Sequence, residues 1–415
     1  MHVNRLSLLH PAVIVSALGY FVDAFDILIF GAVRLKTLRG LGLEGQSLTD
    51  ATLSIQSWQM AGMFVGGIGA GILADRIGRV RALYFSIALY SVATMLCGMA
   101  SSVEAFLVWR TIAGIGLAGE LGTGVTLVVE SLPQRWRGLG ATIMASFGML
   151  GAAAAGTTGW WVNDWRHAYY IGGALGLLLL ALRLSVGESP IFERALRQEG
   201  ISRGNFLAFF SNFERFSRLV KCSLLGITTW FNVGILMTLS PEFGAAKGLV
   251  EPVDPALAVV FFHVGMVAGD AAAGLLSQWL RSRLRALRWF LWAQAVCVAA
   301  YLFVPFSSAA FMYVMIVLLG FAGGYWAVFI THAAEQFGTN LRATAAGAAP
   351  ALVRIAFVPI STAFQGLKAP SAFGDPLLAA AAVGGACIGL ALLASIQLED
   401  PFAKNLDYVE RKAMG

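Results

Sequence analysis

Two acidic residues lie inside the first long apolar stretch of the chain. In the segment Gly19-Tyr-Phe-Val-Asp-Ala-Phe-Asp-Ile, Asp23 and Asp26 stand three residues apart, so a helix places them on one face. If this stretch crosses a membrane, each charge costs about 2.5–3.5 kcal/mol unless a cavity, a partner or a proton stabilises it. Burial and mutual repulsion favour a proton on at least one of them. We therefore predict a pair that loads and releases a proton; a purely structural hydrogen-bonding role is the alternative.

An arginine lies in a second apolar stretch, Arg110-Thr-Ile-Ala-Gly-Ile-Gly-Leu-Ala-Gly-Glu. A buried arginine requires an acid within reach, and Asp26 is the expected partner. An Arg–Asp pair that opens when the acid is protonated would couple proton binding to rearrangement, with Asp23 or Glu120 assisting. The alternative is that Arg110 extends toward the membrane surface. The helix would approach a neighbour closely at Gly114, Gly116 and Gly119.

The second half carries candidates for substrate binding. Arg354 stands near the middle of an apolar stretch, where a guanidinium group suits an anionic substrate such as a carboxylate. The alternative for Arg354 is an internal salt bridge, for example with Asp270. His263 is a candidate second proton site or a hydrogen-bonded packing residue. The remaining candidates are Asn232, Tyr20, Trp230 and Tyr325; for the aromatic Trp230 and Tyr325, plain packing is the alternative.

A glycine-rich polar motif separates two apolar stretches, Gly71-Ile-Leu-Ala-Asp-Arg-Ile-Gly-Arg. Its glycines permit a tight turn and a close approach of helices. The acid and the basic residues could form a cluster that holds in one conformation and breaks in another. The alternative is a solvated basic turn. The candidate gating residues of this motif are Gly71, Asp75, Arg76, Gly78 and Arg79.

The composition indicates a chain that lies mostly within a membrane. Of 415 residues, 58% are hydrophobic and only 13% are charged, about half the share usual in soluble domains. A membrane helix needs about 20 apolar residues. Hydropathy places twelve spans in two sets of six, joined by a polar segment over 187–217. The expected spans are near 11–33, 51–74, 82–100, 104–129, 138–161, 167–186, 218–240, 256–279, 287–305, 309–333, 343–366 and 376–397.

The basic residues indicate how the chain is oriented in the membrane. Together with the cysteines, they also argue against a nucleic-acid-binding, disulfide-linked or zinc-binding protein. Basic residues gather in the loops of one side, which the positive-inside rule makes cytoplasmic, with both termini there. The main exceptions are Arg34, Lys36 and Arg39 in the first external loop. The first stretch is too long for a signal peptide and should remain as a span. The basic residues form no nucleic-acid motif, and the four cysteines have neither disulfide nor zinc spacing.

The two halves resemble each other in sequence. The stretch beginning at Gly71 recurs, degenerate, as Gly274-Leu-Leu-Ser-Gln-Trp-Leu-Arg, an offset of 203 (274 − 71). Gln278 takes the place of the motif's Asp75, so we do not expect the two halves to form fully symmetric acid–base clusters. The pair Glu130 and Arg137, seven residues apart, recurs as Glu335 and Arg342 at an offset of 205 (335 − 130). Parallel repeats of six helices with a site at their interface are a known transporter plan.

These motifs resemble the major facilitator superfamily over essentially the whole chain. The resemblance implies an all-α membrane fold of twelve helices in two six-helix bundles, residues 1–186 and 218–415. It implies that the motif at Gly71, with Glu130, Arg137, Glu335 and Arg342, forms a conformational gate. It also implies proton coupling through Arg110 and Asp26.

Some motifs indicate which branch of the superfamily the chain resembles, and the branches differ between symport and antiport. Glu120 and the segment Gly187-Glu-Ser-Pro resemble metabolite:proton symporters, whereas the double acid in the first span is closer to aromatic-acid symporters. Residues 138–161 lack the proline typical of drug:proton antiporters.

We expect proton-coupled symport of a small polar, anionic metabolite by a monomer in the cell inner membrane. Its partners are a small-molecule substrate and the lipid bilayer, without nucleic acid, and protons take the place of a cofactor. A proton-coupled antiporter or exporter is the alternative. An enzyme is disfavoured because the chain has no H-E-x-x-H, G-x-S-x-G or Walker motif. A channel or a receptor explains the paired buried charges less well than alternating access.

Overall fold

The computed structural model describes residues 11–77, 79–131, 137–184, 209, 212–305, 308–338 and 341–402. All regular elements in these ranges are helices, and strands are absent from them. Seven helices there are long and apolar enough to cross a membrane, or eight if one bent helix pair forms a single span. The prediction of an all-α fold is therefore confirmed.

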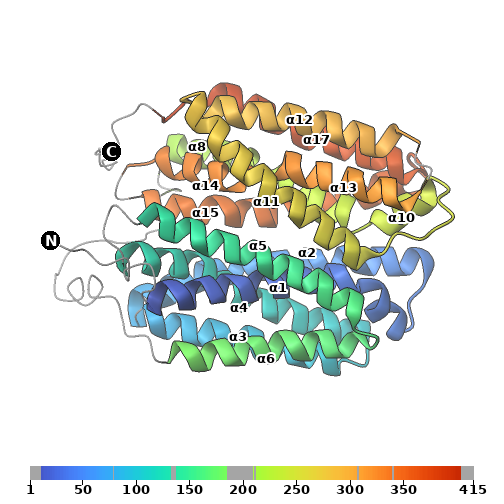
Figure 1. Cartoon of the computed structure of the whole chain (residues 1–415), viewed down its shortest axis with the longest axis horizontal. Helices are drawn as coiled ribbons and strands as arrows, with labels where there is room; N and C mark the ends of the chain where they lie inside the picture. The colour runs from blue at the N-terminus through green and yellow to red at the C-terminus, as the bar shows by residue number, and fades with distance from the viewer. Residues whose placement is uncertain are drawn as a thin grey trace. The chain divides into compact units, whose positions relative to one another are not determined.

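The chain forms two compact units, residues 1–51 with 58–203 and residues 52–57 with 204–415. The helices of the first half are α1 (Pro11–Gly40), α2 (Gly45–Ile77), α3 (Arg79–Met99), α4 (Val103–Ser131), α5 (Arg137–Trp161) and α6 (Trp165–Arg183). Those of the second half are α8 (Phe213–Leu224), α9 (Ile227–Phe231), the π-helix η4 (Asn232–Met237), α10 (Ser240–Ala246), α11 (Pro255–Trp279), α12 (Arg283–Phe303), α13 (Ala309–Gly323), α14 (Trp326–Glu335), α15 (Arg342–Ile355), α16 (Phe357–Lys368) and α17 (Pro376–Gln397). Figure 1 shows them in chain order.

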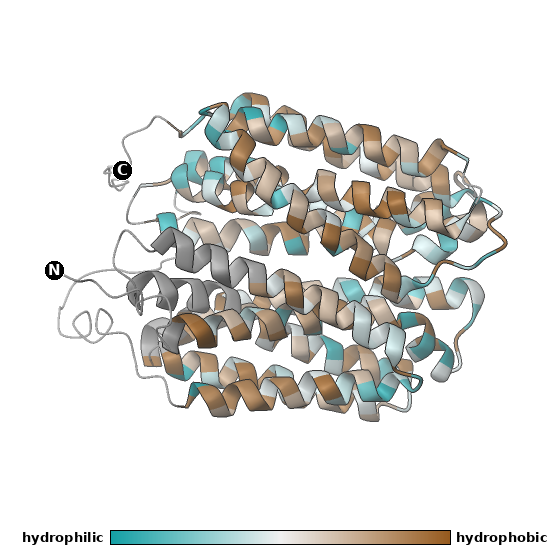
Figure 2. Cartoon of the chain, in the orientation of Figure 1, coloured by the Kyte–Doolittle hydropathy of each residue, from teal (hydrophilic) through white to brown (hydrophobic). Residues whose placement is uncertain are grey.

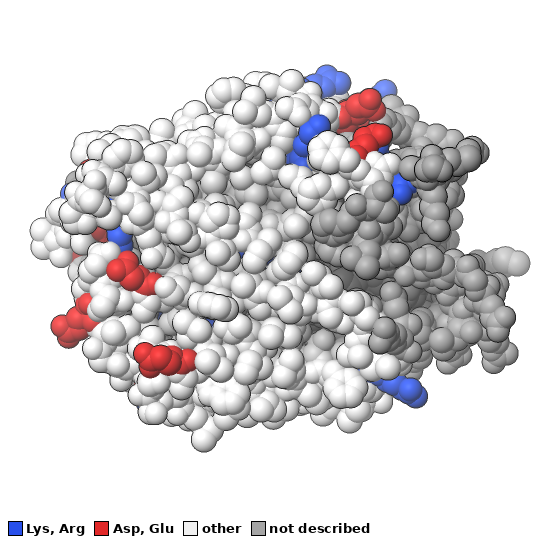
Figure 3. Space-filling view, turned by 180° about the vertical axis from the view of Figure 1, so that it is seen from behind, with Lys and Arg blue, Asp and Glu red and all other residues white. Residues whose placement is uncertain are grey.

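Large apolar side chains are exposed along the helices. On α3, Phe85, Leu89 and Val92 follow the helical spacing of one face and expose 64%, 41% and 50% of their surface. Apolar residues run along the helices, and many polar ones lie toward the helix ends (Figure 2). On the face drawn in Figure 3, the charged side chains of the described residues gather near the helix ends. Exposed apolar faces of this size suit a lipid environment, and the chain is a multi-pass membrane protein.

Two glycines bring α2 and α4 into close contact in the first unit. A Cβ added at Gly62 would collide with the carbonyl oxygen of Thr111, and one at Gly66 with that of Ile115. Backbones approach this closely only where the side chain is absent, which is the usual role of small residues between membrane helices.

The same contacts recur between α11 and α13 in the second unit. A Cβ at Gly265 would collide with the carbonyl oxygen of Val317, and one at Gly269 with that of Phe321. These glycines stand 203 positions after their counterparts in α2 (265 − 62), and their partners 206 positions after those in α4 (317 − 111). The agreement with the offsets of the sequence motifs supports an internal duplication.

The hydrogen bond that caps the start of a helix also recurs in the two halves, at α4 and at α13. The Ser102 hydroxyl accepts the Ala105 N–H at the start of α4, and 206 positions later (308 − 102) Ser308 accepts the Phe311 N–H at the start of α13. Because a capping side chain satisfies an otherwise unpaired N–H group, the two halves begin these helices by the same device.

Gly66→Ala is expected to lower the thermal unfolding midpoint, because overpacking typically costs about 1–3 kcal/mol. Gly69→Ala in the same helix is the matched control, since its Cβ would meet nothing within 4 Å. The control should lose no stability, because alanine is a better helix former than glycine. Thermal unfolding in detergent measures both. Equal midpoints in the two variants would contradict the packing argument.

Three helices of the second half are interrupted. The pair Phe213–Leu224 and Ile227–Met237 bends by 41°, and its second part contains η4. The break between α13 and α14 falls at Gly324 and Tyr325, and the one between α15 and α16 falls at Ala356. At the first break, a Cβ on Gly226 would lie 2.9 Å from Phe329 of α14 and from Val353 of α15. The interruptions therefore lie close together, and interrupted helices are common at transporter binding sites.

The end of the first span differs from the prediction. The predicted span ends at residue 33, but α1 continues to Gly40, so Arg34 is in a helix and is fully buried rather than in an external loop. The Lys36 ammonium group donates to the carbonyl oxygens of Gly159 and Val162, at 2.8 and 2.7 Å. These carbonyls lie at the end of α5, where a cation is stabilising. Arg34 and Lys36, two of the three exceptions to the positive-inside pattern, are thus held within the fold.

The second half begins with α8, whose first residue, Phe213, lies within the polar segment predicted over 187–217. The last residues of that segment are therefore helical. The Asn212 side chain accepts the N–H groups of Glu214 and Arg215 and caps this helix. A hydropathy profile misses these residues because α8 begins with a polar, amphipathic turn.

Candidate functional site

Arg110 and Asp26 form an ion pair between α4 and α1, as the sequence predicted. Nη1 of Arg110 lies 3.2 Å from both carboxylate oxygens of Asp26, and Nη2 donates to the Asp26 backbone carbonyl. The side chains are 0% and 1% exposed. The alternative, in which Arg110 extends toward the membrane surface, is wrong for this conformation.

Two further side chains complete this pair. The Thr94 hydroxyl of α3 donates to Oδ1 of Asp26 at 2.8 Å. The Tyr169 ring of α6 lies 5.9 Å from the guanidinium carbon of Arg110. Gly172 leaves room here, because a Cβ on it would lie 3.3 Å from the Thr94 methyl carbon. The sequence analysis missed both Thr94 and Tyr169, because a lone threonine or tyrosine in an apolar stretch gives no distinctive signal.

The geometry makes the charge state of Asp26 matter to helix packing. In a dry interior, removing one partner of an ion pair costs about 3–5 kcal/mol because the other charge is left uncompensated. A proton on Asp26 removes the charge that Arg110 and Thr94 face. The arrangement can therefore convert protonation of one carboxyl group into a weaker association of α1 with α3 and α4.

The other predicted residues of the first half lie nearby or outside the described side chains. Asp23 lies one turn before Asp26 in α1 and is 2% exposed. The Tyr20 ring packs against Gly148 of α5, because a Cβ there would overlap the ring carbons. Glu120 lies within α4, but its side chain is outside the described part. Gly114 and Gly116 allow close contact as predicted, since their Cβ atoms would lie 2.5 Å from the Gln59 carbonyl oxygen and 2.7 Å from the Tyr90 nitrogen.

Asn232 lies at the start of the π-helix of the second unit. Its side chain is 0% exposed, and neither its amide nitrogen nor its amide oxygen has a hydrogen-bond partner among the described residues. A Cβ on Gly323, at the break before α14, would lie 3.3 Å from the amide nitrogen. Buried polar groups are almost always paired, and π-helical turns are frequent at functional sites. This amide can donate to and accept from a bound molecule.

Tyr325 is fully buried, and its hydroxyl is used within the fold. It donates to the Leu225 carbonyl oxygen at 3.0 Å and contacts the Thr228 hydroxyl. These bonds link the break before α14 to the break after α8. The hydroxyl thus positions the interrupted helices, and a contact of Tyr325 with substrate stays a prediction. Trp230 is half-buried in α9.

The polar candidates on α11 and α15 do not bond to one another within the described ranges. Asp270 is half-buried and accepts the Ala327 N–H at 3.1 Å, which stabilises the first turn of α14. Within the described ranges it forms no ion pair with Arg354. Arg354 is 8% exposed in the last turn of α15. Nδ1 of His263 lies 2.8 Å from the Val259 carbonyl oxygen of its own helix, which fits the packing role.

Charged side chains connect the start of α12 to the end of α14 in the second unit. Nε and Nη2 of Arg283, at the start of α12, donate to the Glu335 carboxylate at 3.2 and 3.3 Å. Glu335 thus pairs with Arg283 of another helix. Arg342, the other predicted gate residue of this half, stands at the start of α15. The Arg283 guanidinium carbon lies 5.0 Å from the Phe402 ring.

Asp400, after α17, caps the start of α12. Its carboxylate accepts the Ser282 hydroxyl and the N–H groups of Arg283, Leu284 and Phe402. Burial alone would raise the pKa of Asp400, but these four donors outweigh it and hold the pKa below its ordinary value. The residue therefore remains a carboxylate at neutral pH and ties the end of the last helix to α12.

The gate residues predicted in the first half fall largely outside the described part. Gly78 is outside it. The other members lie in described helices, but nothing is described of their side chains: Gly71, Asp75, Arg76, Arg79, Glu130 and Arg137. The second copy informs on the turn, because Arg281 stands where the motif has Gly78 and adopts a φ of +47°. This left-handed conformation is the one that glycine adopts without strain.

Neither a metal nor a disulfide is indicated in the described ranges. They contain no group of three or more His, Cys, Asp or Glu side chains that could hold a metal ion. The four cysteines are free.

Comparisons with known proteins point to one family. The model described as "Major Facilitator Superfamily" matches residues 14–361. A niacin transporter, NiaP, of Acinetobacter baylyi is 29% identical over 378 residues, which cover 82% of this chain and 83% of that protein. A gentisate transporter of Corynebacterium glutamicum is 24% identical over 357 residues, covering 84% and 78%.

A solved structure has the same fold. The xylose transporter XylE from E. coli, in an inward-open conformation, matches with a TM-score of 0.73 and 18% identity, covering 95% of this chain and 97% of that one. At this identity the likeness concerns the fold.

Proposed function

Because the chain belongs to the major facilitator superfamily, we propose that it is a proton-coupled symporter that carries a small anionic metabolite by alternating access. It is a membrane transporter rather than an enzyme. In this proposal twelve spans form two six-helix bundles, residues 1–186 and 218–415, joined by a cytoplasmic segment over 187–217. The protein works as a monomer in the cell inner membrane, with both termini cytoplasmic and protons as the coupling ion.

The observation that carries the proposal is the buried pair of Asp26 and Arg110. Its contacts join three helices, since Thr94 also donates to Asp26. A proton reaching Asp26 from outside would neutralise it, release Arg110 and Thr94, and allow α1 to shift. Loss of the proton inside would restore the pair and reset the carrier. Asp23, one turn away, and Glu120 would assist this transfer.

The driving force depends on the number of coupled protons. One proton carried with a monocarboxylate anion moves no net charge, so the pH gradient alone drives accumulation, about tenfold per pH unit at 1.4 kcal/mol per tenfold. A second coupled proton would make transport electrogenic, and about 100 mV would then supply about 2.3 kcal/mol more.

We assign substrate binding to the interrupted helices of the second half. Asn232 offers a buried amide donor and acceptor, and Arg354 offers a cation for a carboxylate. Niacin and gentisate, the compounds after which the two relatives are named, are both single aromatic rings that carry a carboxylate. We therefore propose an aromatic monocarboxylate as the substrate class, with His263, Asp270 and Trp230 as further candidates in the second unit. Tyr20 of the first unit stays a separate candidate for substrate binding.

We assign gating to the charged clusters at the helix ends. Arg283 and Glu335 would form the latch of the second half, and the motif from Gly71 to Arg79 with Glu130 and Arg137 that of the first. Each would hold in one state of the cycle and break in the other.

The test is the pH inside proteoliposomes while aromatic carboxylates, aliphatic acids, amino acids and sugars are added outside one at a time. Acidification by an aromatic carboxylate is the expected result and identifies substrate and symport together. Alkalinisation would instead favour the alternative of proton-coupled antiport. An absence of any pH change, with transport of a labelled compound intact, would refute proton coupling.

A further inference from the structure

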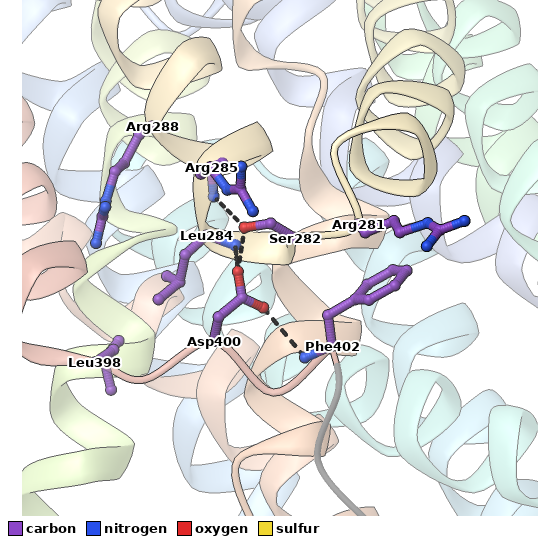
Figure 4. A pocket seen from close by; sticks show the side chains of 8 residues that line it. All are labelled: Arg281, Ser282, Leu284, Arg285, Arg288, Leu398, Asp400 and Phe402. Carbon is purple, nitrogen blue, oxygen red and sulfur yellow. Dashed lines mark hydrogen bonds between the residues drawn. The ribbon is translucent and has the colours of Figure 1, made fainter.

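A pocket of about 330 Å³ lies between the start of α12 and the end of α17. Figure 4 shows Asp400 between Ser282 and Leu284 on one side and Phe402 on the other, with three arginines around them. The pocket is built within the second unit and belongs to neither the coupling pair nor the substrate site proposed above. Its lining is strongly basic, because Arg281, Arg285 and Arg288 face a single acid, Asp400.

The acceptor positions of the single acid of this pocket are all occupied. Asp400 accepts four hydrogen bonds, from the Ser282 hydroxyl and three backbone N–H groups, two on each carboxylate oxygen. The nearby acid Glu335 is paired with Arg283. The one negative charge of Asp400 therefore leaves the three lining arginines with a net positive charge.

The lining arginines keep donors for a ligand. Arg288 is held in place by Ser395, through Nε to the hydroxyl at 3.1 Å and Nη2 to the carbonyl oxygen at 2.6 Å. Arg281 and Arg285 are exposed, and their guanidinium groups form no ion pair or hydrogen bond with the rest of the described chain. One fixed and two uncommitted guanidinium groups suit the oxygens of a phosphate group.

The surroundings place this pocket at the edge of the lipid-facing surface. Trp279 ends α11 and exposes 79% of its surface, and Trp289 and Trp292 on α12 expose 65% and 59%. Exposed tryptophans beside arginines are typical of the level at which lipid headgroups lie. Basic pockets between membrane helices at this level bind phosphate-bearing headgroups.

We propose that this pocket binds a phosphate group at the membrane surface, supplied by the headgroup of an anionic phospholipid. Arg288 provides a fixed contact, and Arg281 and Arg285 close on the remaining oxygens. A free phosphate ion offers the same chemistry, and the experiment below separates the two sources.

The test compares the full-length chain with a variant that carries Arg281→Asn and Arg285→Gln. Asparagine is chosen at position 281 because it tolerates the left-handed backbone there, so the charge is removed without added strain. The control is Arg39→Gln, which removes an exposed charge at the end of α1. Delipidated protein is titrated with phosphatidylglycerol, phosphatidylcholine or inorganic phosphate, and native mass spectrometry counts bound molecules.

We expect phosphatidylglycerol to bind in preference to phosphatidylcholine, and the double variant to bind it about tenfold more weakly or worse, as loss of charge-assisted contacts implies. The Arg39 variant should bind like the parent chain. Binding of inorganic phosphate that the double variant loses would support the phosphate site and identify its source as the free ion. Equal binding of phosphatidylglycerol and of phosphate by the parent and the double variant would overturn the proposal.

Discussion

Asp26→Asn is expected to abolish proton-driven accumulation of substrate while sparing exchange of substrate across the membrane. The amide cannot release a proton, so the carrier loses the step that couples its cycle to the proton gradient. Asparagine keeps an oxygen for Thr94 and Arg110, and Arg110 retains its bond to the backbone carbonyl of residue 26. The amide carries no charge, as in the proton-loaded carrier, so α1 should associate more weakly with α3 and α4 and the movement that exchange requires should persist.

The experiment measures uptake of the identified substrate into proteoliposomes, with an imposed pH gradient and then with unlabelled substrate inside. Asp23→Asn tests the neighbouring buried acid on the same helix face, and Glu104→Gln tests an exposed acid at the start of α4. Only the variant at Asp26 should lose accumulation fully. Unchanged accumulation in that variant, or complete loss in the Asp23 variant alone, would remove Asp26 from the mechanism.

Asn232→Leu is expected to weaken substrate binding by about 5- to 150-fold, which corresponds to the roughly 1–3 kcal/mol lost when a buried polar partner is removed. The thermal unfolding midpoint without substrate should not fall. Neither atom of the Asn232 amide has a hydrogen-bond partner in the described chain, so its replacement by a similar apolar side chain removes no bond of the fold.

Gln294→Leu is the matched control for this prediction. Gln294 is also a fully buried amide, but its nitrogen donates to the Thr228 carbonyl oxygen at 3.3 Å. Its replacement should lower the unfolding midpoint, because a buried hydrogen bond of the fold is removed. Substrate affinity is measured by equilibrium binding and stability by thermal unfolding. If Asn232→Leu lowered stability as much as Gln294→Leu and left affinity unchanged, the amide would be structural.

Composition and local spacing were enough to predict much of this protein. An excess of apolar residues over a chain of this length leaves a membrane-spanning all-α fold as the stable arrangement, because each backbone group must be satisfied within its own helix. The pairing of Asp26 with Arg110 also followed from the sequence, since an isolated charge in an apolar span requires a partner. The internal repeat was visible in the motifs, and the glycine contacts at the same offsets support it.

The choice of partners among many possible ones was decided by tertiary structure. Glu335 pairs with Arg283 rather than with the Arg342 that follows it in sequence, and Thr94 reaches Asp26 from 68 positions away. Such contacts depend on which helix faces meet, and hydropathy does not encode the rotation of one helix against another.

The interruptions of the helices likewise appear only in the fold. The sequence by itself determined that this chain spans a membrane and which charges must be paired there, because the transfer of polar groups into lipid is costly for any arrangement of helices. The tertiary structure alone decided that Asn232 lacks a hydrogen-bond partner among the described residues, that Tyr325 links two helix breaks, and that three arginines line one pocket. These features depend on side chains from distant segments meeting in space, which local sequence patterns do not specify.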